Sequence, residues 1–455
     1  MLRTISINKL IIEKNKWTPK YAYIFKKLEI STNTMQLNEF ISEGPINGID
    51  SRNFTKIGKN YIRISDMKRF FVSYSDIKKV EINKIPKKIQ LQEKDILISR
   101  KGTPGISVII TREDIDDIIG TEAILIRIKK CYDPYYLVAF FNSKVFYEQI
   151  LNNLSGTVAS GINHPSLKKL KILYDDNLIE KISDKVKKTI ELHVKANSIL
   201  HNAQNIFYQK LSVDFSRIKK ENSFLTNISN LIEKDLWTPA YSYPFYINIL
   251  KTIQKKWQTV PVGEIATVKK GNEVGSIYYN KYLDKKDTDI PFIRTSDLVN
   301  YEVDQFPDFY IPKEIYQELK QDIKMGDIIF TKDGKIGMAA MITKNDKVII
   351  SSGIVRLRLR NEAKKYNFTP EYLFVILSLK ETGLYPSIRR TVVASTIPHL
   401  REERLKDIEI PILDKDSIDE ITKLVKEAFE LKDIKKKLIN EVREEIDNYF
   451  ENLIK

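Results

Sequence analysis

Two short glycine-framed segments carry positive charge and are the first candidates for chemistry. They read Gly102-x-x-Gly105 and Gly334-Lys335-x-Gly337, and the nearby cations are Arg100, Lys101, Lys332 and Lys335. Such a loop could cradle a phosphate, but a P-loop needs Gly-x4-Gly-Lys-Ser/Thr after a strand, and neither segment contains that sequence. We therefore expect tight turns that join strands and present cations on a loop.

Two of the four histidines, His164 and His399, occupy matched positions in similar stretches of sequence. Neither has a histidine, cysteine or close carboxylate pair at metal-ligand spacing, which favours packing or hydrogen bonding over metal binding or catalysis. We find no Walker pair, His-Glu-x-x-His, dinucleotide fingerprint, nucleophile–base set or Asn/Asp-Pro-Pro-Tyr/Phe tetrapeptide of amino-methyltransferases. The sequence thus predicts no catalytic residue, no metal site and no cofactor.

These residues recur because the sequence contains two similar copies of one unit. Residues 13–23 and 233–243 share the pattern Glu-Lys-x-x-Trp-Thr-Pro-x-Tyr-x-Tyr. Further matches keep the same order: Ile62-Arg63-x-Ser65-Asp66 with Ile293-Arg294-x-Ser296-Asp297, then the glycine segments, then Val158-Ala159-Ser160-x-Ile162-x-His164 with Val393-Ala394-Ser395-x-Ile397-x-His399. Collinear matches predict a tandem duplication with pseudo-two-fold symmetry, which suits a ligand such as duplex DNA.

Short strands and helices must position these residues. Apolar, β-branched runs predict strands at 106–111, 123–128, 338–343 and 354–359. In the last run, arginines alternate with Val355, Leu357 and Leu359, which predicts one buried face and one cationic face. Helices are expected at 136–152 and 371–384, each shortly after a proline.

Each half ends in a long helical pattern with steps of three and four residues. The seams are Ile179, Ile182, Val186, Thr189, His193, Ala196, Leu200, Ala203 and Phe207, then Leu424, Ala428, Leu431, Lys435, Leu438, Val442 and Tyr449. They predict an antiparallel coiled coil, because about 50 Å of helix would otherwise leave an apolar stripe in water. His193 and Lys435 would fix its register, and Lys432 would lie on the solvated face. The alternative is that each helix packs on its own domain.

Composition favours an anionic partner. The net charge is +15 and the pI about 9.3, which indicates nucleic acid before an acidic membrane. The single cysteine, Cys131, excludes an intrachain disulfide and suits the cytoplasm. The sequence contains no run of about 18 apolar residues, so it predicts no membrane-spanning helix.

Clustered or matched cations are the expected DNA contacts. They are Arg63, Lys68, Arg69, Arg100, Lys101, Lys269, Lys270, Arg294, Lys332, Lys335, Arg389 and Arg390. Phosphate contacts would supply affinity without sequence information. For Arg63 and Arg294 the alternative is an ion pair with the aspartate of the same motif, which would hold the end of a strand.

With these motifs in place, the chain resembles a specificity (S) subunit of a type I restriction–modification system. The resemblance covers almost the whole chain and is closest at Thr396-Ile397-Pro398-His399-Leu400, followed by residues 405–411. The first half departs from the family at Gly161-Ile162-Asn163-His164-Pro165, and it has Leu173-Tyr174 where Ile-Pro is usual.

The resemblance implies an α+β fold with two target recognition domains, each followed by a long helix. The implied parts are a leader (1–34), the first recognition domain (35–175), the first long helix or central conserved region (176–212), a linker with the repeated leader (213–258), the second recognition domain (259–412) and the second long helix or C-terminal conserved region (413–455).

It also implies a non-catalytic subunit of a cytoplasmic complex. Each domain would read one half of an asymmetric double-stranded DNA site, and the helices would set the spacer and dock two methyltransferase subunits. Those subunits use S-adenosylmethionine, and restriction subunits, where present, use ATP and magnesium, so this chain itself needs no cofactor. Two alternatives stay open, a partner-free DNA-binding regulator and a coiled-coil assembly protein.

Overall fold

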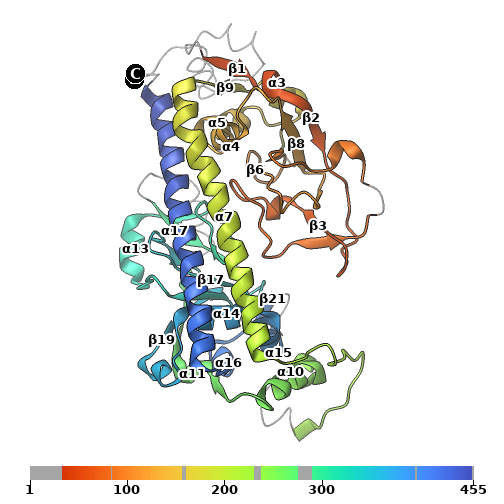
Figure 1. Cartoon of the computed structure of the whole chain (residues 1–455), viewed down its shortest axis with the longest axis vertical. Helices are drawn as coiled ribbons and strands as arrows, with labels where there is room; N and C mark the ends of the chain where they lie inside the picture. The colour runs from red at the N-terminus through yellow and green to blue at the C-terminus, as the bar shows by residue number, and fades with distance from the viewer. Residues whose placement is uncertain are drawn as a thin grey trace. The chain divides into compact units, whose positions relative to one another are not determined.

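The computed structural model describes residues 33–82, 85–155, 160–229, 237–274, 289–394 and 397–452. The chain divides into two units, one with residues 1–191 and 437–455 and the other with residues 192–436 (Figure 1). The first leader copy lies outside the described residues, and the second is described only from Trp237 onward.

The first unit is built around a four-stranded antiparallel sheet in the order β2-β8-β5-β6. Its strands are β2 (Ile41–Asn47), β8 (Ala123–Ile128), β5 (Ile96–Ser99) and β6 (Ser107–Ile109). A smaller sheet has β3 (Lys59–Ile62) between β4 (Lys78–Val80) and β7 (Ile118–Ile119), and β1 (Thr34–Gln36) pairs with β9 (Lys171–Leu173). The short helices are α3 (Leu37–Phe40), η1 (Ile64–Asp66), η2 (Lys87–Ile89), α4 (Pro134–Phe141), α5 (Lys144–Asn152) and α6 (His164–Lys168).

The second unit repeats this topology. Its four-stranded sheet has the order β11-β19-β16-β17, formed by β11 (Ala266–Lys270), β19 (Ile354–Leu359), β16 (Ile328–Thr331) and β17 (Ala339–Met341). Here β12 (Ile290–Ile293) lies between β15 (Tyr310–Ile311) and β18 (Ile349–Ile350), and β10 (Thr259–Pro261) pairs with β22 (Glu409–Pro411). In both units one strand pair is parallel, β3 with β7 and β12 with β18. The α+β class and the internal repeat are therefore confirmed.

Two hairpins and several short helices complete the second unit. The hairpins are β13 (Leu298–Val299) with β14 (Glu302–Val303) and β20 (Val392–Ala394) with β21 (Ile397–His399). The helices are α9 (Pro239–Ser242), α10 (Pro244–Gln254), α11 (Val262–Ile265), η4 (Thr295–Asp297), α13 (Lys313–Leu319), η5 (Asn361–Tyr366), α14 (Pro370–Ser378), η6 (Lys380–Leu384), α15 (Tyr385–Arg389) and α16 (Glu402–Lys406).

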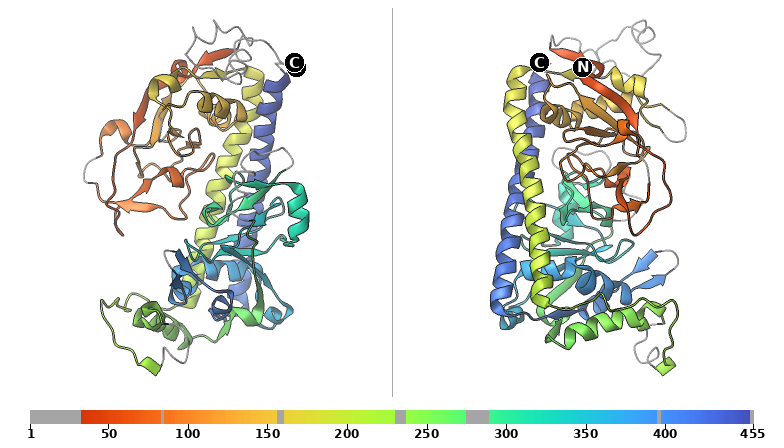
Figure 2. Two further views of the ribbon diagram at one scale, coloured as in Figure 1. Left: turned by 180° about the vertical axis from the view of Figure 1, so that it is seen from behind. Right: turned by 45° about the vertical axis from the view of Figure 1, so that its right-hand side comes forward.

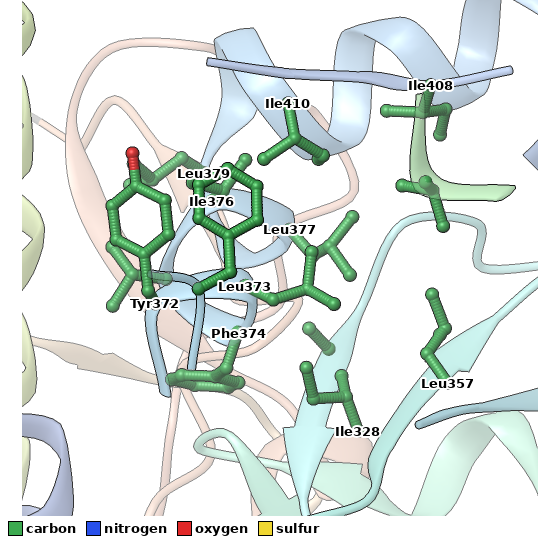
Figure 3. Close-up of a cluster of buried hydrophobic side chains, with 14 of the residues drawn as sticks. Ile328, Leu357, Tyr372, Leu373, Phe374, Ile376, Leu377, Leu379, Ile408 and Ile410 are labelled. Atoms are coloured by element: carbon green, nitrogen blue, oxygen red, sulfur yellow. The ribbon is translucent and has the colours of Figure 1, made fainter. Parts of the chain in front are cut away.

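The largest core of the second unit forms where α14 crosses the sheet. Figure 3 shows side chains of α14, among them Leu373 and Leu377, packed with Ile328 of β16 and Leu357 of β19. Helix α10 joins this core through Phe245, Ile249 and Ile253, so a packed helix lies within the stretch expected to be a linker. Each such buried side chain stabilises the fold by roughly 1.5–3 kcal/mol, which is why these short elements hold together.

The helix expected at 136–152 is two helices, so that prediction was wrong. Helix α4 ends at Phe141, because the Asn142 side chain bonds both the N–H and the C=O of Ser107. Ser143 then caps α5 by accepting from the N–H of Phe146. These polar groups offer the backbone an alternative to continuing the helix.

The prediction for 371–384 was also too long. Helix α14 ends at Ser378 and a π-helical turn follows before α15. At Gly383 a Cβ would lie 2.0 Å from the carbonyl oxygen of Leu377, so the turn admits only glycine there.

The two long helices are α7 (Asp176–Leu211) and α17 (Lys415–Asn452), and the boundary between the units falls inside both. The carboxylates of Asp175 and Asp414 cap their first turns. In the second unit Lys195 lies 3.5 Å from Glu427 and Lys210 lies 3.1 Å from Glu420, so the helices run antiparallel. In the first unit Lys185 pairs with glutamates of α17. Within each unit the two helices lie side by side (Figures 1 and 2).

The expected seam of α7 is buried, except that Ile179 is only half-buried. The seam of α17 was partly wrong, because Leu424, Leu431, Leu438 and Tyr449 are half-buried. The buried row keeps steps of four and three but is displaced, and it reads Ile421, Val425, Ala428, Lys432, Lys435, Ile439, Val442 and Ile446. Lys432, expected on the solvated face, is 0% exposed.

Candidate nucleic-acid interface

The matched arginines Arg63 and Arg294 each brace a short 3-10 turn. The carboxylate of Asp66 accepts from the backbone N–H of Arg63 at 3.0 Å and from its Nε at 2.8 Å. In the second unit Asp297 accepts from the N–H of Arg294 at 2.8 Å. The guanidinium of Arg294 lies 3.9 Å above the ring of Phe309, where it can also make a cation–π contact. The alternative of an ion pair at the strand end is therefore present at both motifs.

The glycine segments form the tight turns that the sequence predicted. Gly102 and Gly105 have φ values of 68° and 93°, and Gly334 and Gly337 have 66° and 90°, all in the left-handed region. At the start of each turn a buried hydroxyl, that of Ser99 or Thr331, accepts from a backbone N–H at 2.9 Å.

The turns differ in the cations that they present. Lys335 is exposed, and Lys101 is about one-third exposed and lies 3.5 Å from Glu122. Lys332 is only 3% exposed, with its ammonium 3.2 Å from Asp333 and 3.7 Å from Glu402. The second turn therefore presents Lys335 but not Lys332, which corrects the expectation that both stand on the loop surface. Arg100 is half-buried beside the first turn.

Both matched histidines make side-chain hydrogen bonds, as expected. The Nε2 atom of His164 lies 2.8 Å from Oδ1 of Asn47, and Nδ1 of His399 bonds the carboxylate of Asp333. Burial lowers the pKa of His164, and the nearby charges of Arg100 and Lys168 lower it further. His399 thereby ties β21 to the residue that precedes the second glycine turn.

The remaining predicted cations fall into two groups. Lys269 and Lys270 are exposed on β11, and Lys68 and Arg69 are half-buried, with Arg69 donating to the carbonyl of Asn142 at 3.0 Å.

Arg389 and Arg390 turn toward the protein instead. The guanidinium of Arg389 lies 4.7 Å from the ring centroid of Tyr241, in the second leader copy. Arg390 is 8% exposed and donates to the carbonyls of Pro386 and Asp407. Arg390 thus does not lie on the solvated surface.

Sequence reasoning missed a repeated arginine–aspartate brace across each main sheet. Nε of Arg127 on β8 lies 3.1 Å from Oδ1 of Asp95, and Nε of Arg358 on β19 lies 2.6 Å from Oδ1 of Asp327. The expected cationic face of β19 is therefore largely neutralised, and Arg356 on the same face is only 7% exposed. The matched Asp95 and Asp327 were a usable signal, because a repeated acid needs a repeated partner.

Sequence reasoning also missed a buried lysine cluster in the second unit, formed by Lys432, Lys435, Lys436, Glu302 and Asp346. The ammonium groups of Lys432 and Lys436 lie 3.4 Å and 3.7 Å from Glu302, which Lys435 also bonds. Asp346 accepts from Lys436 at 2.7 Å. Burial, only partly offset by Glu302, lowers the pKa of Lys432 to about 8. Glu302 is buried as well, but the three ammonium groups hold the pKa of its carboxyl below the usual range.

The β13–β14 hairpin delivers Glu302 to this cluster. Its two turn residues, Asn300 and Tyr301, have φ values of 48° and 69°, as a type I′ turn requires. The carbonyl of Asn300 accepts from Lys432 at 3.0 Å, so turn and strand both bind α17.

His193 of α7 predicts a pH-dependent stability. Burial and the charges of Lys435 and Lys432 hold its pKa well below 6.5, so the folded chain keeps this imidazole neutral. As pH falls below 6.5, the unfolded chain binds a proton that the folded chain does not, and stability is lost by up to about 1.4 kcal/mol per pH unit. His193→Leu should remove that part of the slope between pH 7.5 and 5.5 in urea unfolding. The matched variant His201→Leu, at an exposed position of α7, should leave the slope unchanged; an unaltered slope in His193→Leu would contradict the assignment.

Neither a metal centre nor a membrane-crossing helix is found among the described residues. They contain no group of three or more His, Cys, Asp and Glu side chains able to hold a metal ion. Within the same ranges, no helix combines the length and apolarity needed to cross a membrane.

Comparison with known proteins finds one family model that matches within the second half of the chain. Residues 254–444 match the family model described as the type I restriction modification DNA specificity domain. The comparison with curated proteins gives no match.

Three solved structures are similar over most of their length. The S subunit of a type I restriction–modification system from M. genitalium is 14% identical over 94% of this chain and 98% of its own, with a TM-score of 0.37. The HsdS subunit from Thermoanaerobacter tengcongensis is 15% identical over 92% and 96%, with a TM-score of 0.27. A third, from work on complex assembly and conformational transition of the type I R-M system, is 15% identical over 90% and 97%, with a TM-score of 0.28. The match of residues 254–444 to the type I restriction modification DNA specificity domain confirms the resemblance found in the sequence.

Proposed function

We propose that the chain is the DNA sequence recognition subunit of a cytoplasmic type I restriction–modification complex and has no catalytic centre of its own. Its recognition domains, residues 35–175 and 259–412, would each read one half of an asymmetric double-stranded site. Two methyltransferase subunits would dock on the long helices, with restriction subunits joining where the system has them.

The observation that supports this proposal best is one framework that carries different side chains at equivalent positions. The arginine–aspartate brace and the glycine turns recur in both units. In the glycine turns, exposed Thr103 stands where exposed Lys335 stands, and, counting along the strand from each brace, Leu125 of β8 stands where Arg356 stands in β19. A protein that reads two unlike half-sequences needs this combination, because the backbone must dock alike while the side chains that meet bases differ.

The long helices support the spacer-setting part of the proposal. Helix α7 has 36 residues and α17 has 38. At about 1.5 Å per residue, α7 alone spans about 54 Å, or about 16 base pairs at 3.4 Å each.

A salt series tests the DNA-binding claim. The affinity of the purified chain for duplex DNA should fall steeply and linearly with salt on logarithmic axes, because each phosphate contact releases counterions. Lys335→Ala should reduce the slope by about one without changing the preferred sequence. Lys423→Ala, at an exposed position of α17, is the matched control and should leave the slope unchanged. A flat salt response would favour the assembly-protein alternative over DNA recognition.

A further inference from the structure

The second unit contains a hollow of about 390 Å³ between its main sheet and the turn that follows α13 (α13 and β19 are labelled in Figure 1). Its apolar lining comes from Leu319, Ile323 and Ile350. Pockets that hold small ligands usually measure about 300–1,000 Å³ and combine apolar walls with a few polar groups. The size and lining therefore suit a ligand with a flat apolar part.

Among the described residues, the three cations of the polar lining have one carboxylate within 4.0 Å, that of Asp322, which lies 3.8 Å from Nη1 of Arg356. Lys269 and Lys270 are exposed, and among the described residues neither lies within 4.0 Å of a carboxylate. Arg356 donates through Nη1 to the carbonyls of Gln321 and Asp322, but its buried Nε–H has no acceptor there. The hollow therefore attracts an anion.

Hydrogen bonds connect the residues that line the hollow to one another. Gln321 is 8% exposed, and its Nε2 donates to Oδ1 of Asn272 at 2.8 Å and to the carbonyl of Ile350 at 2.7 Å. Its Oε1 accepts from the N–H of Ile350 at 2.8 Å. Oδ1 of Asn272 already accepts a hydrogen bond from Gln321, so the side-chain Nδ2 of Asn272 is the group left to donate to a ligand. At Gly271 a Cβ would lie 2.2 Å from the Ile350 carbonyl, so only glycine lets β11 end so close to β18.

The first unit lacks this chemistry at the equivalent place. Arg356 pairs with Lys269 across the β11–β19 ladder, and its counterpart Leu125 pairs with Ile46 across β2–β8. Leu125 is 0% exposed within an apolar core against which Ile46 packs. The cations are therefore not needed to form the fold, because the same framework accepts two apolar residues there.

We infer that this hollow binds one nucleotide, with the phosphate at Lys269, Lys270 and Arg356 and the base against the apolar wall. The Asn272 amide would donate to an acceptor on the edge of the base. Proteins that hold an extruded base use this pairing of apolar contact with edge hydrogen bonds. The nucleotide comes either from the bound duplex, which rests on the proposed function, or from the free mononucleotide pool.

The first arm of the test uses free mononucleotides. Calorimetric titration of the whole chain with dAMP, dCMP, dGMP or TMP should give binding if the pool is the source. The double variant Lys269→Ile/Arg356→Leu copies the residues of the first unit and should lower the affinity at least tenfold. Lys423→Ala should bind like the parent, and equal thermal melting of all three proteins establishes that the variants are folded.

The second arm uses duplex DNA with 2-aminopurine placed at each position of the recognised sequence in turn. If the duplex is the source, fluorescence should rise at one position with the parent and stay low with the double variant. Binding of a mononucleotide in the first arm, or a rise in fluorescence in the second, supports the inference and identifies the source of the nucleotide. Response in neither arm, by a chain that binds DNA, overturns the inference and leaves the proposed function standing. A parent chain without DNA affinity overturns the proposed function, and the mononucleotide arm then decides the inference alone.

Discussion

Replacing Glu302 by alanine should lower the free energy of unfolding by about 3–5 kcal/mol. Glu302 is 4% exposed and is the carboxylate that Lys432 and Lys435 both contact. Its removal leaves two buried ammonium groups without a countercharge, which costs far more than an exposed ion pair is worth. Urea unfolding at pH 7 measures the loss. The stability that this carboxylate contributes is complete above about pH 4.5 and is lost as pH falls further, because its pKa is lower in the folded chain.

The matched control is the exposed pair between Lys195 and Glu427. Its atoms lie 3.5 Å apart, and both side chains are roughly half exposed, so Glu427→Ala should cost under about 1 kcal/mol. Combining Glu302→Leu with Lys432→Met and Lys435→Met should recover most of the stability, since apolar residues of similar volume can replace a buried ion cluster. A loss below about 1 kcal/mol in Glu302→Ala would show that the buried lysine cluster does not hold the hairpin on α17.

Shortening both long helices by seven residues should shorten the DNA spacer by about three base pairs. Seven residues are about two helical turns, or about 10.5 Å, against 3.4 Å for each base pair. Deleting residues 183–189 together with 437–443 keeps the steps of three and four in both seams, so the helices can still pair. Both half-sequences should stay the same, because the recognition domains are untouched. The measurement is the methylated motif in cells that co-express the variant with its methyltransferase.

The control for this deletion removes residues 183–189 from α7 alone. That change leaves seven residues of α17 without their partners, so it should destabilise the chain instead of giving a shorter spacer. A complex with both helices shortened that still methylates at the parental spacing would contradict the proposal that the helices set the spacer length. A complex with an altered half-sequence would contradict it too.

The sequence predicted the repeat, two of the four strands in each main sheet (β6 and β8, β17 and β19) and the two long helices, because each depends on local periodicity. It failed where a distant partner decides the outcome. Lys432 looks solvated from its neighbours in the helix, but Glu302, 130 residues away in the chain, allows it to be buried. The break between α4 and α5 likewise depends on hydrogen bonds between Asn142 and Ser107. Ser107 lies 35 residues earlier in the chain, so the helical periodicity around Asn142 cannot predict it.

The sequence predicted where the cations of the candidate interface lie in its motifs better than it predicted which of them are exposed. Pattern matching found the aspartate contacts of Arg63 and Arg294 and both glycine turns, since each motif carries its own bracing residue, whereas DNA contact by the two arginines stays a prediction. It could not tell Lys335, which is exposed, from Lys332, which turns toward Asp333 and Glu402. Net charge counts cations but does not say which of them are buried.

The most direct test of the account is the methylated motif of the unaltered chain. Methylome sequencing of cells that co-express it with its cognate methyltransferase subunit should show one new bipartite motif. We predict methylated adenine within two unlike half-sequences separated by a fixed spacer. The absence of any new motif, with a methyltransferase subunit that is active beside another specificity subunit, would contradict the account, and so would a single uninterrupted motif.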